Sequence, residues 1–252
     1  MARTYNIDKS LFKQHFRIAP TTQPPLSSTT SPLDSGLYAP IAAVAISRTV
    51  PFVALHAGPD ASPSSPVIGV SHYPAFSKHF KLGLAPESHK SLAAAEGLES
   101  AAGRDMLWEE LRMETSNGSR HAWSMLMPVE GDLTAGGVDS GPAGHGAHER
   151  KRRTFVWKRT HSVAVDGMHI APLSTRNWKL VEQPADGSGR GTHRPQSPEV
   201  GEAGEDKATP LAVFTTSTQR GRCGVLQINV DYGSGFDTML LLALLTLYCS
   251  GR

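Results

Sequence analysis

The sequence predicts an all-β fold with one helix, in which antiparallel strands form a closed barrel around a hydrophobic C-terminal helix. Three observations lead to this prediction. The chain of 252 residues ends on a run that is apolar on every side. Many short runs of alternating or β-branched residues precede it. A closed barrel of this length is an ordinary single domain.

The terminal apolar run is too short to cross a bilayer as a helix. Asp237 and Arg252 enclose fourteen residues, which as a helix reach roughly 21 Å, against about 30 Å of bilayer hydrocarbon. We expect Asp237 to cap the helix, Phe236 to pack against Leu241, and Gly251 to end it. A helix without a polar face must be enclosed by protein or by lipid, so burial is favoured over a C-terminal membrane anchor. The residues assigned to this central helix are Asp237, Met239, Leu240, Leu241, Leu242, Leu244, Leu245 and Leu247.

Strands are predicted along the chain before this helix. In the first part, the runs LYAPIAAVAI, PFVALHAG and PVIGVSHY have the composition of short strands. Further on, Asn117-Gly118 is a strong hairpin signal between two apolar-rich arms. The first arm is assigned to a strand, although Leu107, Trp108 and Leu111 would also form one stripe of a short helix.

The alternation of apolar and polar residues is clearest in the second half of the chain. In RRTFVWKRTHSVAV, Phe155 and Trp157 fall on one face and Lys158 on the other. Trp178 and Leu180 share a face in RNWKLVEQ in the same way. The runs TPLAVFTTST and CGVLQINVDYG are β-rich and end on turn residues.

Three segments have the composition of unstructured insertions. Residues 19–36 are rich in Pro, Ser and Thr, residues 131–149 are rich in Gly, and residues 183–209 are polar with little to bury. The apolar pattern does not change across any of them. We therefore expect a single domain over residues 1–252, with disordered insertions at these three places.

A closed barrel satisfies every strand edge, and a central helix fills the lumen that would otherwise be void. The stretches that carry a family resemblance are RRTFVWKRTHSVAVDG, STRNWKLVEQ, LAVFTTS and GVLQINVDYGSGFDTMLLLALLTLY, with VIGVSHYPAFSKHFKLGL and MLWEELRME in the first half. Together they resemble a family of fungal proteins with a tubby C-terminal-like domain. The resemblance implies a barrel of roughly twelve strands around a central hydrophobic C-terminal helix.

The same resemblance suggests a lipid ligand. The superfamily includes tubby proteins, which bind phosphoinositide head groups, plant proteins linked to defence, and phospholipid scramblases, while the fungal branch has no assigned activity. Clustered Lys and Arg can hold phosphate through charge-assisted hydrogen bonds. We therefore expect a non-enzymatic binding module for anionic phospholipids, against the alternative of a merely solvated strand face. The candidate residues are Lys151, Arg152, Arg153, Lys158, Arg159, Arg176 and Lys179, the last two if their strand pairs with the first.

Two other functions remain open. A protein-interaction or regulatory adaptor would use the insertions, above all residues 183–209 with the Ser-Pro step at Ser197. A scramblase-like membrane protein is the more remote alternative. No acidic cluster with the spacing of a calcium loop is present, and the one anchor candidate falls short of a span.

The residues do not indicate an enzyme. The chain has no G-x-S-x-G elbow, and GSGRGT lacks the Lys-Ser/Thr pair of a phosphate loop. His145 and His148 have no third metal ligand beside them. Cys223 lies beside Arg220 and Arg222, which favour a thiolate, but has no evident His partner. We expect no catalytic residue, no cofactor and no metal.

Charge, cysteine content and the N-terminus indicate the setting in which the protein works. A net charge of +2 gives no field for nucleic acid. Two cysteines are too few for a disulfide framework, and the first residues contain no apolar region of a secretory signal. We expect an intracellular protein, cytoplasmic or peripheral to a membrane, whose partners are anionic phospholipids or an unknown protein.

Overall fold

The computed structural model describes residues 2–9, 15–21, 43–46, 52–58, 65–74, 76–85, 106–128, 150–169, 176–183, 209–219 and 221–251. This part of the chain forms twelve strands and one α-helix. They are β1 (Arg3–Lys9), β2 (His15–Pro20), β3 (Ala43–Ile46), β4 (Val53–His56), β5 (Val67–His72), β6 (Phe80–Leu84), β7 (Leu107–Met113), β8 (Arg120–Pro128), β9 (Arg150–Arg159), β10 (Trp178–Gln183), β11 (Ala212–Thr216), β12 (Arg222–Ile228) and α2 (Ser234–Ser250).

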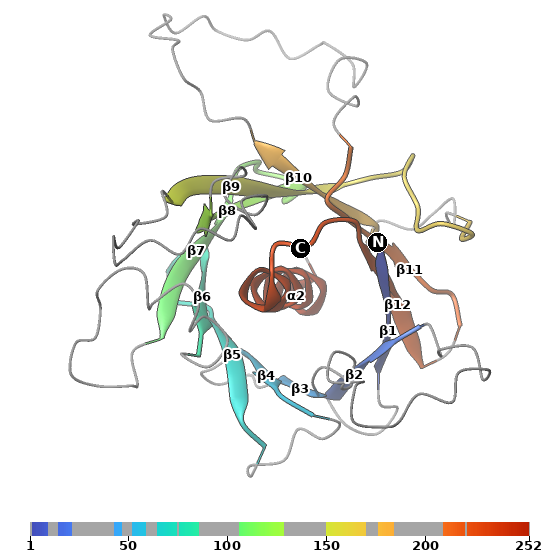
Figure 1. Cartoon of the computed structure of the whole chain (residues 1–252), viewed down its shortest axis with the longest axis horizontal. Coiled ribbons are helices and arrows are strands. Elements are labelled where there is room, and N and C mark those ends of the chain that lie inside the picture. Colours follow the sequence, from blue (N-terminus) through green and yellow to red (C-terminus); the bar gives the residue numbers. More distant parts are fainter. Residues whose placement is uncertain are drawn as a thin grey trace, which may run out of the picture.

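The strands form one antiparallel sheet in which each strand pairs with its neighbours in the chain. The exception is β1, which pairs with β2 on one side and with the last strand, β12, on the other. The strand order therefore returns to its start as a closed barrel, and Figure 1 shows α2 inside this ring. The prediction of an antiparallel all-β fold with one C-terminal helix is confirmed.

Three local predictions are also confirmed. The arm that begins at Leu107 is a strand, β7, and Asn117-Gly118 lies in the turn between β7 and β8. Gly118 has the positive φ of 65° that favours glycine in such a turn. The strand that begins at Trp178 pairs with β9.

The boundaries of the predicted insertions need correction. Ala19 and Pro20 are the last residues of β2, and Gln183 is the last residue of β10, because strand pairing continues through them. Residues 22–36, 131–149 and 184–208 lie outside the described residues.

The helix starts earlier than predicted and without a side-chain cap. It begins at Ser234, three residues before Asp237, and the residue at its N-cap is Gly233, with φ 88°. The prediction that Asp237 caps the helix is wrong: this side chain is in the first turn and bonds to Arg3 of β1 instead. The predicted end is correct, since Gly251 takes the left-handed conformation and donates its N–H to Tyr248 O.

The helix is buried on every side. The apolar residues Met239 to Leu245 are at most 1% exposed. Its two buried hydroxyls are satisfied within the helix, because Thr238 donates to Ser234 O at 2.8 Å and Thr246 to Leu242 O at 2.7 Å. Among the described residues, no helix has the length and hydropathy needed to span a bilayer.

Aromatic side chains hold the helix at both ends. Near its start, the Phe236 ring lies 5.0 Å from Phe155 and 5.1 Å from Tyr232. Near its end, the Tyr248 ring meets Phe16 at 6.0 Å and Phe214 at 5.8 Å, both edge-on. Edge-to-face pairs of this kind contribute about 0.5–1.5 kcal/mol each beyond their burial. We call these two ends of the barrel the Asp237 end and the Tyr248 end.

Two glycines leave space for side chains that pack against them. A Cβ on Gly224 of β12 would stand 2.4 Å from Thr215 O, a backbone atom, and 2.7 Å from the Phe214 ring. A Cβ on Gly83 of β6 would meet the Trp108 ring at 2.9 Å. Trp108 lies on the outer surface and is 46% exposed, so its ring has room to move away.

These contacts predict different costs for the same substitution. Gly224→Ala should lower the free energy of unfolding by about 2 kcal/mol or more, because a strand backbone has to shift. Gly83→Ala is the matched control and should cost clearly less. Denaturant unfolding of both variants measures the difference, and equal losses would contradict the packing described.

Candidate functional site

The predicted basic residues lie on two faces and at two ends of the barrel. Phe155 and Trp157 of β9 are fully buried in the core. Because strand side chains alternate, Arg153 and Arg159 share their face, while Arg152 and Lys158 point outward. Lys151 is exposed and lies at the Asp237 end, because β9 starts there, two residues before Arg153, which bonds to Tyr232 near the start of α2. The seven candidates therefore do not form one patch.

Arg153 is held by other side chains of the fold. Its guanidinium donates two hydrogen bonds to the Glu182 carboxylate, both at 2.5 Å, and a third to the Tyr232 hydroxyl at 3.1 Å. It also lies 4.8 Å from the centre of the Tyr232 ring. The bonds to Glu182 raise the pKa of Arg153. Its role in the structure is to connect β9, β10 and the segment that leads into α2.

Arg152 is also paired with a carboxylate, that of Glu109 on β7. The Glu109 side chain is 9% exposed, against 55% for Arg152. Burial raises the pKa of Glu109, and the positive charge of Arg152 opposes that rise. Removing Arg152 would leave a buried carboxylate without its partner.

Two further candidates lie against aromatic rings at the Tyr248 end. The Arg159 guanidinium is 5.3 Å from the Trp178 ring, and that of Arg176 is 5.3 Å from the Tyr248 ring. Both are cation–π contacts. Arg176 is exposed, so this contact leaves part of its guanidinium open to solvent.

The remaining candidates, Lys158 and Lys179, form part of a basic row. Lys158 of β9 lies directly opposite Lys179 of β10 and Arg120 of β8 in the strand register. Arg120 also donates to the Glu114 carboxylate at 3.2 Å. Directly opposed like charges destabilise a sheet. We call Arg120, Lys158 and Lys179 the cationic row.

Arg120 was absent from the sequence-based candidates. The signal that could have found it is the hairpin at Asn117-Gly118, which puts Arg120 at the start of a strand. Its pairing with Lys158 depends on the register of β8 against β9, which strand composition does not specify.

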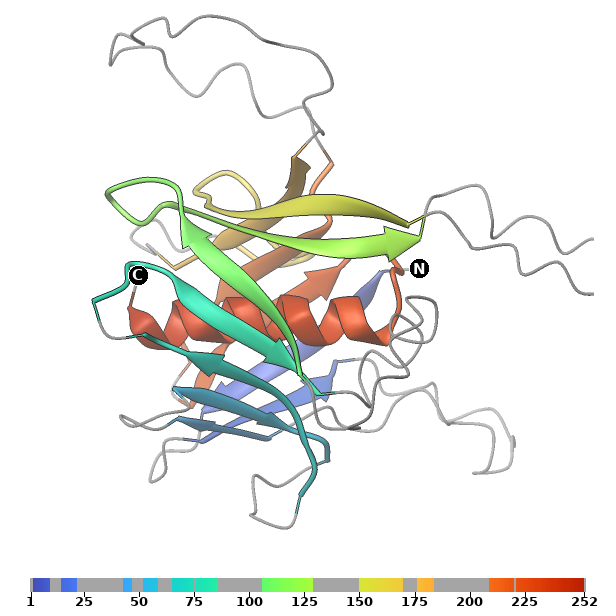
Figure 2. The same cartoon turned by 90° about the vertical axis from the view of Figure 1, so that its left-hand side faces the viewer.

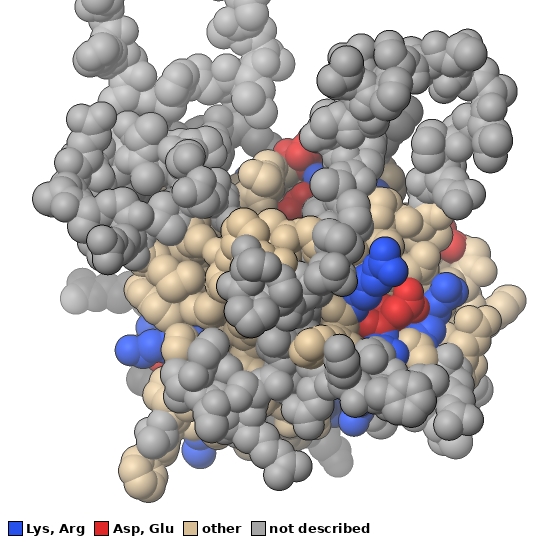
Figure 3. All heavy atoms as spheres, turned by 90° about the horizontal axis from the view of Figure 1, so that it is seen from below, with Lys and Arg blue, Asp and Glu red and all other residues tan. Residues whose placement is uncertain are grey.

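The side of the barrel opposite the cationic row has mixed charge. Figure 3 views the molecule from the side of β3 and β4, where one group of Lys and Arg side chains flanks acidic side chains and other basic side chains lie singly among uncharged surface. Asp8, for example, lies between Arg17 and Arg222 in the register and bonds to Arg222 at 3.3 Å.

A shallow pocket of about 520 Å³ lies on the outer surface of β5–β7. His72, Lys81, Trp108, Glu109 and Glu110 line it. Partial burial and the charge of Lys81 lower the pKa of His72. Glu109 bonds to Arg152, and Glu110 accepts a hydrogen bond from Arg112 at 2.6 Å. The charges around this pocket are thus largely balanced.

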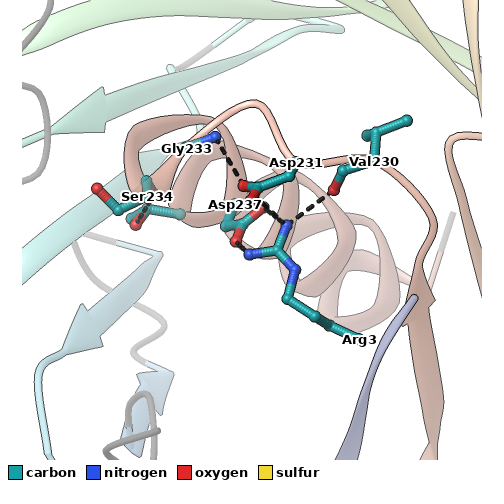
Figure 4. Close-up of polar contacts among 7 residues, drawn as sticks. Arg3, Val230, Asp231, Gly233, Ser234 and Asp237 are labelled. Atoms are coloured by element: carbon teal, nitrogen blue, oxygen red, sulfur yellow. Dashed lines mark hydrogen bonds and ion pairs between the residues drawn. The ribbon is translucent and has the colours of Figure 1, made fainter. Parts of the chain in front are cut away.

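Arg3 and Asp237 form the main polar contact between the helix and the barrel. Figure 4 shows the Arg3 guanidinium of β1 reaching Asp237 in the first turn of α2. It donates to Asp237 at 2.5 and 3.1 Å and to Val230 O at 2.8 Å. Burial raises the pKa of the Asp237 carboxyl to about 6, although the Arg3 charge pulls it down.

The surroundings of Cys223 do not favour a thiolate. Cys223 is buried, and burial raises its pKa above the ordinary value. Burial raises the pKa of Cys249 as well, to about 12. Within the described ranges, no group of three His, Cys, Asp or Glu side chains could hold a metal ion. His145 and His148 lie outside these ranges.

Comparison with models of known protein families, with curated proteins and with solved structures finds no match to this chain.

The raised pKa of Asp237 predicts the pH dependence of stability. The folded protein binds this proton more tightly than the unfolded chain, whose pKa is near 3.8. Protonation of Asp237 therefore stabilises the folded protein as the pH falls through about 6, and this stabilisation is lost as the pH rises. From pH 7 to pH 5, wild type should gain about 1 kcal/mol relative to Asp237→Asn.

Denaturant unfolding at both pH values tests this prediction. Asp231→Asn is the control, because Asp231 also lies near Arg3, at 3.7 Å, but its side chain is 80% exposed. The opposite sign, with wild type losing stability relative to Asp237→Asn on acidification, would show that the attraction of Arg3 outweighs burial.

Proposed function

We propose that this protein is a tubby-like, non-catalytic module that binds anionic phospholipid head groups at a membrane surface. The cationic row is the proposed contact. The overall architecture supports the kinship, because strands in antiparallel succession surround a C-terminal helix as the sequence resemblance implies. With that helix buried, the protein meets lipid through its surface as a peripheral protein.

The register of the cationic row is the observation that carries the proposal. Three cations lie side by side on β8, β9 and β10, so their charges repel one another, and the Glu114 carboxylate offsets part of this repulsion through Arg120. A phosphate group beside them replaces this repulsion with attraction. Each Lys or Arg close to an anionic membrane contributes about 1 kcal/mol to binding.

The other candidates have different parts in this proposal. Arg176 and Arg159 lie at the same end as the row and add to its field. Arg152 and Arg153 are left out, because each bonds to a carboxylate of the fold. Arg120 bonds to Glu114 in the same way, so Lys158 and Lys179 are the proposed phosphate contacts of the row. Lys151 is left out because it lies at the Asp237 end.

Vesicle sedimentation with the full chain tests the proposal. Wild type should bind vesicles that contain phosphoinositide or phosphatidylserine, bind neutral phosphatidylcholine vesicles little, and lose affinity as salt rises. The double variant Lys158→Glu, Lys179→Glu should bind at least about tenfold more weakly.

The matched control is Lys151→Glu, which reverses an exposed charge at the other end of the barrel and should have little effect. A loss of binding in Lys151→Glu as large as that in Lys158→Glu or Lys179→Glu alone would show that binding depends only on net charge. Wild-type binding that is absent, or equal for neutral and anionic vesicles, would overturn the proposal.

A further inference from the structure

The connection between β5 and β6 exposes two aromatic side chains. Phe76 is fully exposed, and Tyr73 is 41% exposed although its ring stacks 4.9 Å from Phe80. In the described part of the chain, the other large hydrophobic residues with comparable exposure are Val67 and Trp108. Val67 lies away from this connection, at the start of β5, whereas the Trp108 ring of β7 lies 5.2 Å from His72, the last residue of β5.

The backbone holds Phe76 in an unfavourable conformation. Its φ is 64°, and it is the one residue other than glycine with positive φ in the described ranges. For a bulky residue this conformation is a true outlier. The Phe76 side chain is surrounded by solvent, so it makes no packing contact that would offset this strain. An outlier of this kind points to a use outside the fold.

Hydrogen bonds on the β6 side of Phe76 position this connection. The Ser77 N–H donates to Pro74 O at 3.1 Å, and the His79 N–H donates to Ser77 Oγ at 2.9 Å. The Met113 N–H of β7 donates to His79 Nδ1 at 3.1 Å. The exposed ring thus lies on a connection that is stabilised by internal hydrogen bonds and is bonded to β7 through His79.

This connection lies at the Tyr248 end, together with the cationic row. In Figure 2 the β5–β6 and β7–β8 connections and the end of α2 lie at the same end of the barrel. Strand direction puts the start of β8, the end of β9 and the start of β10 there as well. The basic residues that strand ends and connections contribute at this end are Lys9, Arg17, Lys78, Lys81, Arg120, Lys158, Arg159, Arg176, Lys179 and Arg222.

Acidic side chains near this end are largely neutralised. Asp8 pairs with Arg222, Glu110 with Arg112, and Glu114 with Arg120. The end therefore combines a positive field with an exposed aromatic tip. An anionic bilayer matches both features, because lipid phosphates attract the cations and the interfacial region accepts aromatic rings.

We propose that the Tyr248 end of the barrel faces the membrane and that Phe76 inserts between the head groups of an anionic bilayer. This inference rests on the proposed function and adds an orientation to it. The axis of α2 points toward the lipid, while the Asp237 end faces away. Cations and an apolar insertion supply the two signals that stable peripheral attachment requires.

The test compares Phe76→Ser with wild type in vesicle sedimentation with phosphatidylcholine–phosphatidylserine vesicles. Loss of the ring should weaken binding about tenfold or more. The slope of affinity against salt should stay unchanged, because no charge is removed. Val67→Ser is the control, since it removes an exposed apolar side chain at the start of β5, at the other end of the barrel, and should leave binding unchanged.

A second variant separates binding from folding. Phe76→Gly relieves the backbone strain, so it should raise the melting temperature by a few degrees while it weakens vesicle binding as Phe76→Ser does. A defect in folding would instead lower both the melting temperature and vesicle binding.

The outcomes distinguish the two proposals. If wild type does not bind anionic vesicles, the proposed function fails and the insertion fails with it. If the Lys158 and Lys179 variants lose binding while Phe76→Ser binds like wild type, the lipid function stands and the insertion is wrong. Equal losses in Phe76→Ser and Val67→Ser would also overturn the insertion, because they would show an effect of any exposed apolar side chain.

Discussion

α2 has apolar side chains on every side, so it is stable only where protein surrounds it completely. An open sheet would cover one face and leave the other in water, whereas pairing of β1 with β12 closes the ring around the helix. This requirement explains why the inward residues of the strands are apolar. It also explains Gly69 and Gly224, which leave space for the Leu242 side chain and for the backbone at Thr215. Phe236 and Tyr248 complete the core at the two ends.

Closure also joins the two ends of the chain. Arg3, in the first strand, donates to Asp237 in the terminal helix and to Val230 just before it. The contact is costly, because burial raises the pKa of Asp237 despite its partner. The contact holds the start of the helix against β1, the strand that closes the barrel. At the opposite end, the helix is held by the aromatic contacts of Tyr248 with Phe16 and Phe214.

Local pattern predicted the helix and most of the strands, but it missed β1, β2 and β6 and did not predict which side chains would pair. A run without a polar face identified the buried helix, and alternation around Trp157 and Trp178 identified strands that do pair. The pairing of Arg153 with Glu182 and of Arg152 with Glu109 joins distant segments, so basic residues read as one cluster are divided between structural and surface roles. Arg120 depends on strand register, and the strain at Phe76 depends on backbone conformation. Neither the position of Arg120 nor the strain at Phe76 can be predicted from amino-acid composition.

Hydrogen exchange of the α2 amides, measured with and without anionic vesicles, tests the central claim most directly. If the helix is a permanent core and the barrel meets lipid through its surface, residues 239–247 should be among the slowest to exchange in both conditions. New protection on vesicles should appear in the β5–β6 connection and at the start of β8. Fast exchange of the α2 amides in solution, or a change in their exchange rate when vesicles are added, would show that the helix leaves the barrel and would contradict the account.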